Sequence, residues 1–369
     1  MKYGCEKCHG DLKTTPQLPR IIPRSSYGDS FITDLVLSKF CDLIPTERYC
    51  NIASRGGFDG LPPNSLHEVI WKAGQFLLKL YELIRIETLD SKILLGDETT
   101  HEMLEGSDKQ WYLWGFFSSS ACFFEYHDSR SGDVAGDVLS ESSCAVFMSD
   151  AYSGYTKAIR EANELRKIAE LALIIVALCN AHARRYFVEC KEENKDKDFF
   201  IEQYKEIYKV EKEVKELLPM NKPLAAEKRA GLRPCFEAMK EKALNDLDRY
   251  SSKHLYYEAC QYFLNNYEGL TVCLNDPEIP LDNNQSERGL RPHVVGRKTW
   301  YGTHSERGAE AAAIHFTIIE SCKINKVNPR EYYPAIIESI HYGKPVLTPS
   351  QYKEKSLKKM KEILSSQSG

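Results

Sequence analysis

Three acidic residues stand in sequence settings that favour metal-dependent chemistry. Asp97 in LLGDETTHEML and Asp150 in FMSDAYSGY each end or interrupt an apolar, β-branched run, whereas Glu287 in LDNNQSERGLRP lies in a polar, arginine-rich stretch that should be helical. Two strands and a helix could bring the three carboxylates to one point. Because two unit charges ~4 Å apart repel by roughly 4 kcal/mol at an effective dielectric of ~20, such a cluster makes sense when a divalent cation holds it together. Hard oxygen ligands of this kind suit Mg²⁺ or Mn²⁺.

The two aspartates also have ordinary structural interpretations. Asp97 follows Gly96 and could close a turn, and Asp150 could cap a helix that follows its strand. Neighbouring residues on a strand point to opposite faces, so only one of Asp97 and Glu98 can enter a common site. The residues alone leave the structural and the functional interpretations open.

Glu287 has a structural alternative as well. Asn284 could be the N-cap of the following helix, with Glu287 completing a variant capping box. The two roles are compatible, because a first-turn glutamate held by the helix would be a preorganised ligand. Asp282, one turn earlier, is the competing acid and ranks second.

The overall charge does not by itself announce a nucleic-acid binder. The 369 residues are 42% hydrophobic and carry a formal net charge of -4, as in an ordinary globular protein. Two local patches are basic. Between Asn284 and Arg307 the chain has five Lys or Arg and two Glu, and between Gln351 and Glu362 it has five Lys and two Glu. A solvated helix face explains the second patch, but the first surrounds Glu287.

No segment has the length of a membrane helix. The longest apolar run, Leu171 to Cys179, is far shorter than the ~20 residues that a bilayer requires, and MKYGCEKCHG lacks the apolar core of a signal peptide. The 12 cysteines are scattered without the density of a disulfide scaffold, as in a reducing compartment. We therefore expect a cytoplasmic protein with no membrane partner.

The periodicity of apolar residues changes from helical to strand-like near Lys92. Helical spacing predicts helices over 30–43 and 65–87, and again through 190–280. Five strand-like runs lie between them, at 92–99, 111–119, 122–128, 144–150 and 171–179, with helices expected at 137–142 and 155–171. Three strands followed by alternating helix and strand match the ribonuclease H-like layout, in which the first and fourth strands deliver acids to one edge of the sheet.

A further motif lies between the second and third acids. Cys179 and His182 form CNAH, followed by Arg184 and Arg185. A Cys-x-x-His pair alone is weak support for zinc, because two more ligands are required and none has suitable spacing nearby. The two arginines could contact phosphate or simply occupy a solvated helix face.

Five strings in register resemble the transposases of the insertion sequence 66 family of bacterial mobile elements. They run in order from about Pro23 to about Gly343: DETTHEML, SDAYSGY, CNAHARRYF, LDNNQSERGLRPHVVGRKTWYGTHSERGAEAAAIHF and KINKVNPREYY. The resemblance implies an α/β fold with a ribonuclease H-like mixed sheet flanked by helices, a helical insertion before the last catalytic helix and a helical N-terminal region. It places Asp97, Asp150 and Glu287 in the positions of an Asp-Asp-Glu triad.

Resemblance and periodicity together predict six segments. These are a partial zinc-ribbon-like segment and linker (1–22), a helical N-terminal region (23–90), the first part of the core (91–190), a helical insertion (191–280), the last part of the core with the catalytic Glu (281–345) and a basic C-terminal tail (346–369).

The implied activity is cleavage of DNA ends and strand transfer with two Mg²⁺ (or Mn²⁺) ions and no protein nucleophile. The triad would hold the ions, and Cys179 and His182 would belong to the wall of the site. Cationic side chains would contact the DNA backbone without reading its sequence. These are Arg184, Arg185, Arg288, Arg291, Arg297 and Lys298.

The family also implies partners for the chain. They are double-stranded DNA at terminal inverted repeats and target sites, further copies of the chain on DNA, and small accessory proteins of the same element, in a nucleoid-associated location. Cys5 and Cys8 in CEKCHG look like half of a zinc ribbon, which indicates a truncated or misassigned start and a Zn²⁺ site only if upstream ligands are present. A catalytically silent remnant that binds transposon ends and a stand-alone ribonuclease H-like nuclease are the alternatives.

Overall fold

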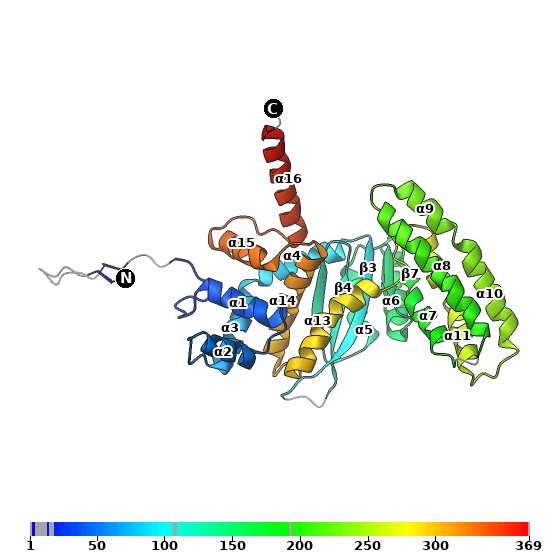
Figure 1. The fold of residues 1–369 in the computed structure, drawn as a ribbon, viewed down its shortest axis with the longest axis horizontal. Helices are drawn as coiled ribbons and strands as arrows, with labels where there is room; N and C mark the ends of the chain where they lie inside the picture. Colours follow the sequence, from blue (N-terminus) through cyan, green and yellow to red (C-terminus); the bar gives the residue numbers. More distant parts are fainter. Residues whose placement is uncertain (1, 4–12, 15–17, 106–108, 192–193, 368–369) are drawn as a thin grey trace, which may run out of the picture.

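The computed structural model describes residues 2–3, 13–14, 18–105, 109–191 and 194–367 (Figure 1). Near the N-terminus a short antiparallel pair joins β1 (Lys2–Tyr3) to β2 (Lys13–Thr14). The CEKCHG motif with Cys5 and Cys8 lies outside the described residues, so its zinc-binding role stays a prediction.

A five-stranded mixed sheet forms the centre of the protein. Its order is β5-β4-β3-β6-β7, with β3 antiparallel to β4, β4 antiparallel to β5, and β3, β6 and β7 parallel to one another. The strands are β3 (Ile93–His101), β4 (Trp111–Phe117), β5 (Cys122–His127), β6 (Val146–Ser149) and β7 (Ile175–Leu178). The predicted α/β class and the order of three strands followed by alternating helix and strand are confirmed. The last strand is shorter than the apolar run 171–179. Leu171 and Leu173, at the beginning of that run, are exposed, and pairing with β6 starts only at Ile175.

Helices cover the two faces of the sheet differently. On one face, α13 (Asn284–Trp300) packs against β3 and β4, and α14 (Glu306–Ile324) packs against β5. α4 (Leu78–Leu89) reaches β5 from the opposite face, where its Arg85 pairs with Glu125. On the other face, Tyr155 of α6 (Ser153–Ile168) contacts Trp114, with ring centroids 5.8 Å apart, and α5 (Gly132–Glu141) packs against α6. Trp114 pairs with Glu98, so the alternating pleat turns Asp97 toward the face that α13 covers.

The predicted helix over 65–87 is two helices. α3 (Pro63–Phe76) ends at Leu77, and α4 begins immediately after it. Leu77 is buried, and the break lets α3 pack against α14 while α4 packs against β5. The other helices before the sheet are α1 (Asp29–Phe40), close to the predicted 30–43, and α2 (Thr46–Arg55).

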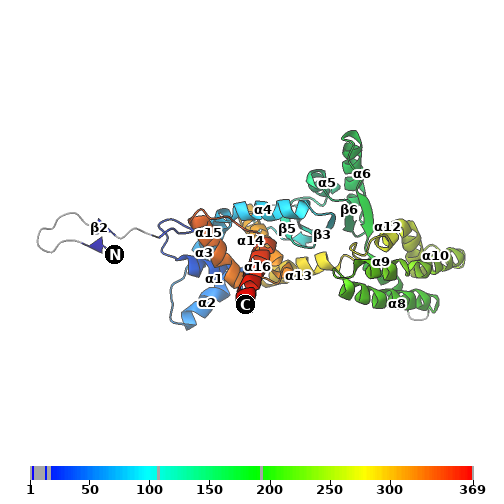
Figure 2. The same cartoon turned by 90° about the horizontal axis from the view of Figure 1, so that it is seen from above.

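A set of helices separates β7 from α13, as the helical spacing predicted. After α7 (Asn180–Val188) come α8 (Asp196–Leu217), α9 (Lys222–Ala230), α10 (Arg233–Leu247), α11 (Leu255–Asn265), α12 (Tyr267–Thr271) and the short 3-10 turn η1 (Val272–Leu274). The two views show α8, α9 and α10 at one end of the molecule and α1, α2 and α3 at the other, with the sheet between them (Figures 1 and 2).

After α14 the chain forms α15 (Pro329–His341) and then α16 (Pro349–Gln367), which carries the basic tail and projects away from the body (Figure 1). The six segment boundaries remain predictions. No helix in the described ranges is both long enough and apolar enough to cross a bilayer.

Glycine allows the close approach of α13 to the sheet. A Cβ atom at Gly289 would overlap the ring of Phe117, which is 1% exposed on β4 and cannot easily move away. Gly289 lies two residues after Glu287, so this contact fixes the height of the helix turn that carries the acid.

We expect Gly289→Ala to lower the free energy of unfolding by about 1–3 kcal/mol, because the added methyl group overpacks a tight interface. Gly136→Ala in α5 is the matched control, since its Cβ would lie 4.0 Å from Ala158 and only the gain in helix propensity, up to ~1 kcal/mol, should remain. Urea unfolding midpoints of both variants test this. Equal effects would show that α13 is not closely packed on β4.

Candidate active site

Two parallel strands bring Asp97 and Asp150 to the same level of the sheet, although Asp97 lies within β3 and does not close a turn. Leu95 of β3 is the register partner of Met148 of β6, so the residues two positions further along each strand, Asp97 and Asp150, stand at matching heights. Asp150 directly follows β6, and its Oδ1 accepts a hydrogen bond of 3.0 Å from the backbone N–H of Tyr152. Asp150 therefore makes the expected turn at the end of its strand and still stands beside Asp97.

The loop before α13 is tied to the ends of two strands. The side-chain amide of Asn283 donates to the carbonyl of Gly96 (3.1 Å), and its backbone N–H donates to Sγ of Cys179 (3.2 Å). In addition, the backbone N–H of Asn180 donates to the carbonyl of Leu281 (3.1 Å). Glu287, in the first turn of α13, is thereby carried to the edge where Asp97 and Asp150 lie.

The predicted capping box is wrong. Asn283, not Asn284, is the N-cap of α13, and it makes no side-chain cap hydrogen bond. Its amide is engaged with Gly96, and its Oδ1 accepts a 2.7 Å hydrogen bond from the Ser286 hydroxyl. The contact with β3 has replaced the cap, so the start of the helix is fixed to the sheet.

Burial and neighbouring charges raise the pKa of Asp97 to about 8. Desolvation is the largest cause, followed by the charges of Glu98, Asp150 and Glu287, and a hydrogen bond from the N–H of Glu98 opposes them. The three predicted acids therefore share one electrostatic environment. The Glu98 side chain lies on the other face, where it accepts hydrogen bonds from Arg130 and from the Tyr155 hydroxyl.

Asp282, the competing acid, belongs to a different environment. It is 4% exposed, and its Oδ1 accepts a 3.2 Å hydrogen bond from the backbone N–H of Asn284. Its charge raises the pKa values of Tyr208 and Glu211 on α8, although burial is the larger cause for both. Its electrostatic neighbours thus lie in the helical insertion.

Side chains of α7 form the wall beside Glu287. His182 Nε2 and an Nη of Arg185 each lie 3.8 Å from Oε1 of Glu287. Nδ1 of His182 is buried and has no hydrogen-bond partner in the described part of the chain. Cys179 is 1% exposed, and burial raises the pKa of its thiol to about 11. His182 thus lies beside Glu287 and Cys179 beside Asn283, and their role in an active-site wall stays a prediction. Within the described ranges, no three His, Cys, Asp or Glu side chains are grouped so as to enclose a metal ion.

The predicted cationic residues occupy two elements. Arg184 and Arg185 lie on α7, whereas Arg288, Arg291, Arg297 and Lys298 lie on α13. Arg288, Arg291 and Lys298 are exposed, but an Nη of Arg297 donates a 2.9 Å hydrogen bond to the Thr100 hydroxyl and so joins α13 to β3.

A buried histidine pair also holds α13 on the sheet, and the sequence motifs did not reveal it. His101 Nδ1 lies 3.3 Å from His293 Nε2, and His101 Nε2 lies 2.7 Å from the Thr303 hydroxyl. The Tyr126 hydroxyl lies 3.0 Å from Nδ1 of His293. Burial lowers the pKa of His101 to about 4 and the pKa of His293 well below its ordinary value, so both rings are neutral near pH 7. The sequence did offer one sign of this pair. His101 follows Asp97 by four residues on the same strand, so both side chains point to the same face of the sheet.

The fold and the acids define an α/β protein with a carboxylate cluster at the carboxyl ends of parallel strands. The family model described as transposase IS66 family matches residues 24–311, a range that includes Asp97, Asp150 and Glu287. The chain therefore belongs to this family.

The chain is also similar to three uncharacterized proteins of Sinorhizobium fredii (strain NBRC 101917 / NGR234). It is 25% identical to y4hP over 369 residues, covering 92% of this chain and 64% of y4hP. It is 23% identical to y4jD, covering 93% of this chain and 68% of the relative, and 26% identical to y4qI, covering 84% and 59%. The chain thus spans 64% of the length of y4hP.

Asp97→Asn should stabilise the metal-free protein increasingly as the pH rises. The carboxyl ionises near pH 3.8 in the unfolded chain and near pH 8 in the folded one, so between these values only the unfolded state releases the proton. The wild type therefore loses stability relative to Asp97→Asn as the pH rises, by up to a few kcal/mol, and the difference levels off above about pH 8. Urea unfolding in EDTA from pH 4 to 9 measures it.

Asp133→Asn serves as a control that should not depend on pH in this range. Hydrogen bonds from Lys157 and Ser131 hold the pKa of the exposed Asp133 carboxyl below its ordinary value of 3.8, so the group is ionised in both the folded and the unfolded states above about pH 4. A difference between Asp97→Asn and wild type that does not change with pH would mean that the carboxylates are not crowded.

Proposed function

We propose that this chain is the catalytic part of a transposase that cleaves the DNA ends of an insertion sequence and joins them to target DNA. The observation that carries the proposal is the environment of Asp97, a buried carboxyl group in the field of Asp150 and Glu287. Membership of the transposase IS66 family supports DNA as the substrate. The strand order agrees with a ribonuclease H-like core, which we propose for residues 91–190 and 281–345.

The chemistry of the donor set suits a hard divalent cation, although the described side chains are not yet grouped as metal ligands and would have to draw together around the ion. Asp97, Asp150 and Glu287 would offer the carboxylate oxygens that Mg²⁺ or Mn²⁺ prefers, and a cation would offset the negative field that raises the pKa of Asp97. Bound as a pair, such ions supply an activated nucleophilic oxygen and stabilise the leaving oxygen. Glu287 would exchange its weak contacts with His182 and Arg185 for the cations.

The chain's own residues would position the DNA. Arg185 lies beside Glu287, and Arg288, Arg291 and Lys298 are exposed on the same helix as that acid, so phosphates that approach the carboxylates meet cations on two sides. No covalent enzyme intermediate is needed. The Cys179 thiol supports this view, because its raised pKa keeps it protonated near neutral pH.

Asp282 is the weaker candidate for the third acid. Its charge acts on Tyr208 and Glu211 of the insertion, whereas the charge of Glu287 acts on Asp97.

The proposed partners are terminal inverted repeats, target DNA, further copies of the chain and small accessory proteins, and the proposed location is the nucleoid of the cytoplasm. Recognition of the ends is proposed for the helices before β3.

The test is cleavage of a duplex that carries the terminal sequence of the element, in Mg²⁺. Asp97→Asn and Glu287→Gln should each lower the cleavage rate by roughly a thousandfold or more, because several kcal/mol of transition-state stabilisation depends on the cations they hold. Both variants should still bind the duplex, since the cations on α7 and α13 are unchanged.

Glu98→Gln and Asp282→Asn are the matched controls. Glu98 neighbours Asp97 but faces the opposite side of the sheet, and Asp282 neighbours Glu287 but faces the insertion. Cleavage should survive both changes. Full cleavage by Asp97→Asn would contradict the proposal, and loss of cleavage in Asp282→Asn with activity retained in Glu287→Gln would assign the third position to Asp282.

A further inference from the structure

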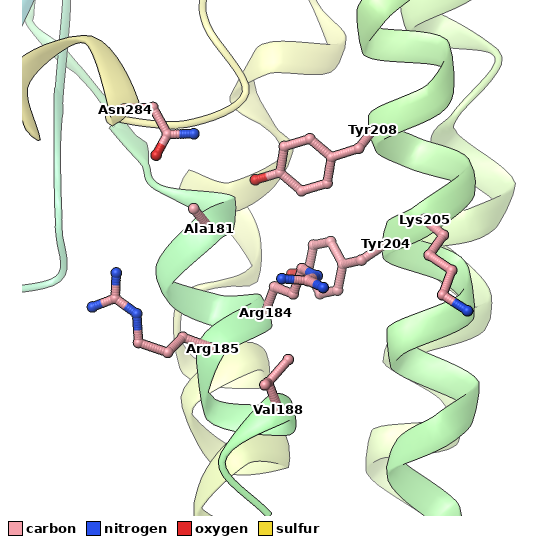
Figure 3. Close-up of a pocket in the computed structure, with 8 residues that line it drawn as sticks. All are labelled: Ala181, Arg184, Arg185, Val188, Tyr204, Lys205, Tyr208 and Asn284. Atoms are coloured by element: carbon pink, nitrogen blue, oxygen red, sulfur yellow. The ribbon is translucent and has the colours of Figure 1, made fainter. Parts of the chain in front are cut away.

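A cleft of about 600 Å³ separates α7 from α8 next to the carboxylates. Arg184 extends from α7 toward α8, while Tyr204 and Tyr208 extend from α8 toward α7 (Figure 3). Arg185, also part of the lining, lies 3.8 Å from Glu287 on the other side of α7. Asn284, in the same first turn of α13 as Glu287, also lines the cleft, so the cleft adjoins the helix turn that carries this acid.

The lining combines positive charge with apolar and aromatic surface. Lys205 is paired with Glu202 (2.7 Å), but Arg184 makes no ion pair with any described residue. The partly buried ring of Tyr208 lies opposite Ala181 at one end of the cleft, and Val188, 45% exposed, lies at the other end (Figure 3). An unpaired guanidinium suits a phosphate, whereas the ring of Tyr208 suits a flat apolar group.

A poorly satisfied hydroxyl points into the same space. Oη of Tyr208 has no hydrogen bond of good geometry in the described part of the chain, but Asp282 lies within reach of it. Burial raises the pKa of the phenol most, and the charge and contact of Asp282 raise it further. Figure 3 shows the hydroxyl directed toward Ala181 and Asn284, across the mouth of the cleft, where a ligand atom could accept a better aligned hydrogen bond in place of Asp282.

We propose that this cleft binds one unpaired nucleotide of the DNA strand that continues from the scissile phosphate. Its phosphate would lie on Arg184 with Lys205 nearby, and its base would lie against the ring of Tyr208. The proposal rests on the proposed function. The volume lies in the range of small-molecule pockets, roughly 300–1,000 Å³, so the cleft can hold one nucleotide but not a DNA duplex. Stacking on a tyrosine accepts any base, so the cleft would be tolerant of sequence.

The test measures binding of a fluorescent single-stranded oligothymidylate to the full chain in EDTA, where no cleavage occurs. Arg184→Ala should weaken binding about tenfold, and the slope of log affinity against log salt should fall by about 0.7, the single-strand value for one phosphate. Lys205→Ala should weaken binding in the same direction. Binding of a duplex of equal length should change less than twofold, about the scatter of such measurements.

Arg160→Ala is the matched control, because Arg160 is an exposed arginine on α6, away from the cleft. It should leave both affinities unchanged. Circular dichroism checks that each variant is folded. If Arg184→Ala does not fold, the single-strand affinity of Lys205→Ala provides the test instead. Tyr208→Phe should bind more weakly than wild type while keeping the salt slope, because it removes only the hydroxyl.

Three results would overturn the inference. They are wild-type affinity of Arg184→Ala and Lys205→Ala for the single strand, an equal loss for single strand and duplex, and competition by free thymidine monophosphate as strong as that by the oligonucleotide. Asp97→Asn separates this inference from the proposed function. If it cleaves normally while Arg184→Ala loses single-strand binding, the catalytic assignment fails and the cleft remains.

Discussion

Crowding of carboxylates around the partly buried Asp97 is the constraint on which the rest of the site depends. Asp97 is placed by β3 and Asp150 by β6, so the parallel pairing of these strands brings two acids together regardless of charge. Burial and the charges of Glu98, Asp150 and Glu287 raise the pKa of Asp97. A third acid can approach only if its helix is held by contacts stronger than the repulsion. Asn283 on Gly96, Gly289 against Phe117 and the buried pair His101 and His293 are those contacts.

The helical insertion also helps to place the third acid. Arg229 of α9 is buried and pairs with Glu211 of α8, and the same guanidinium donates to the carbonyls of Cys273 and Ile279. These carbonyls belong to the segment that leads into α13. Packing within the insertion is therefore transmitted to the loop before Glu287, and α8 is held opposite α7, where the cleft forms.

Much of the fold follows from local pattern, whereas the contacts that complete the site do not. Apolar, strand-like runs predicted the five strands, and the run before Asp150 predicted that this acid follows β6, whereas Asp97 lies within β3. The N-cap of α13 was misplaced by one residue because Asn283 bonds to a strand far away in sequence. His101 and His293 meet only when α13 folds onto β3, and the cleft needs α7 and α8 side by side. No local propensity encodes such long-range packing.

The central claim is that one pocket gathers these carboxylates around hard cations. Diffraction from crystals of the chain soaked in Mn²⁺, recorded at a wavelength where manganese scatters anomalously, tests it most directly. We expect anomalous peaks between Asp97 and Asp150, with Glu287 as a further ligand, and we expect these peaks to be lost in Asp97→Asn. Peaks at Asp282 alone, or no peak beside Asp97 at saturating Mn²⁺, would contradict it.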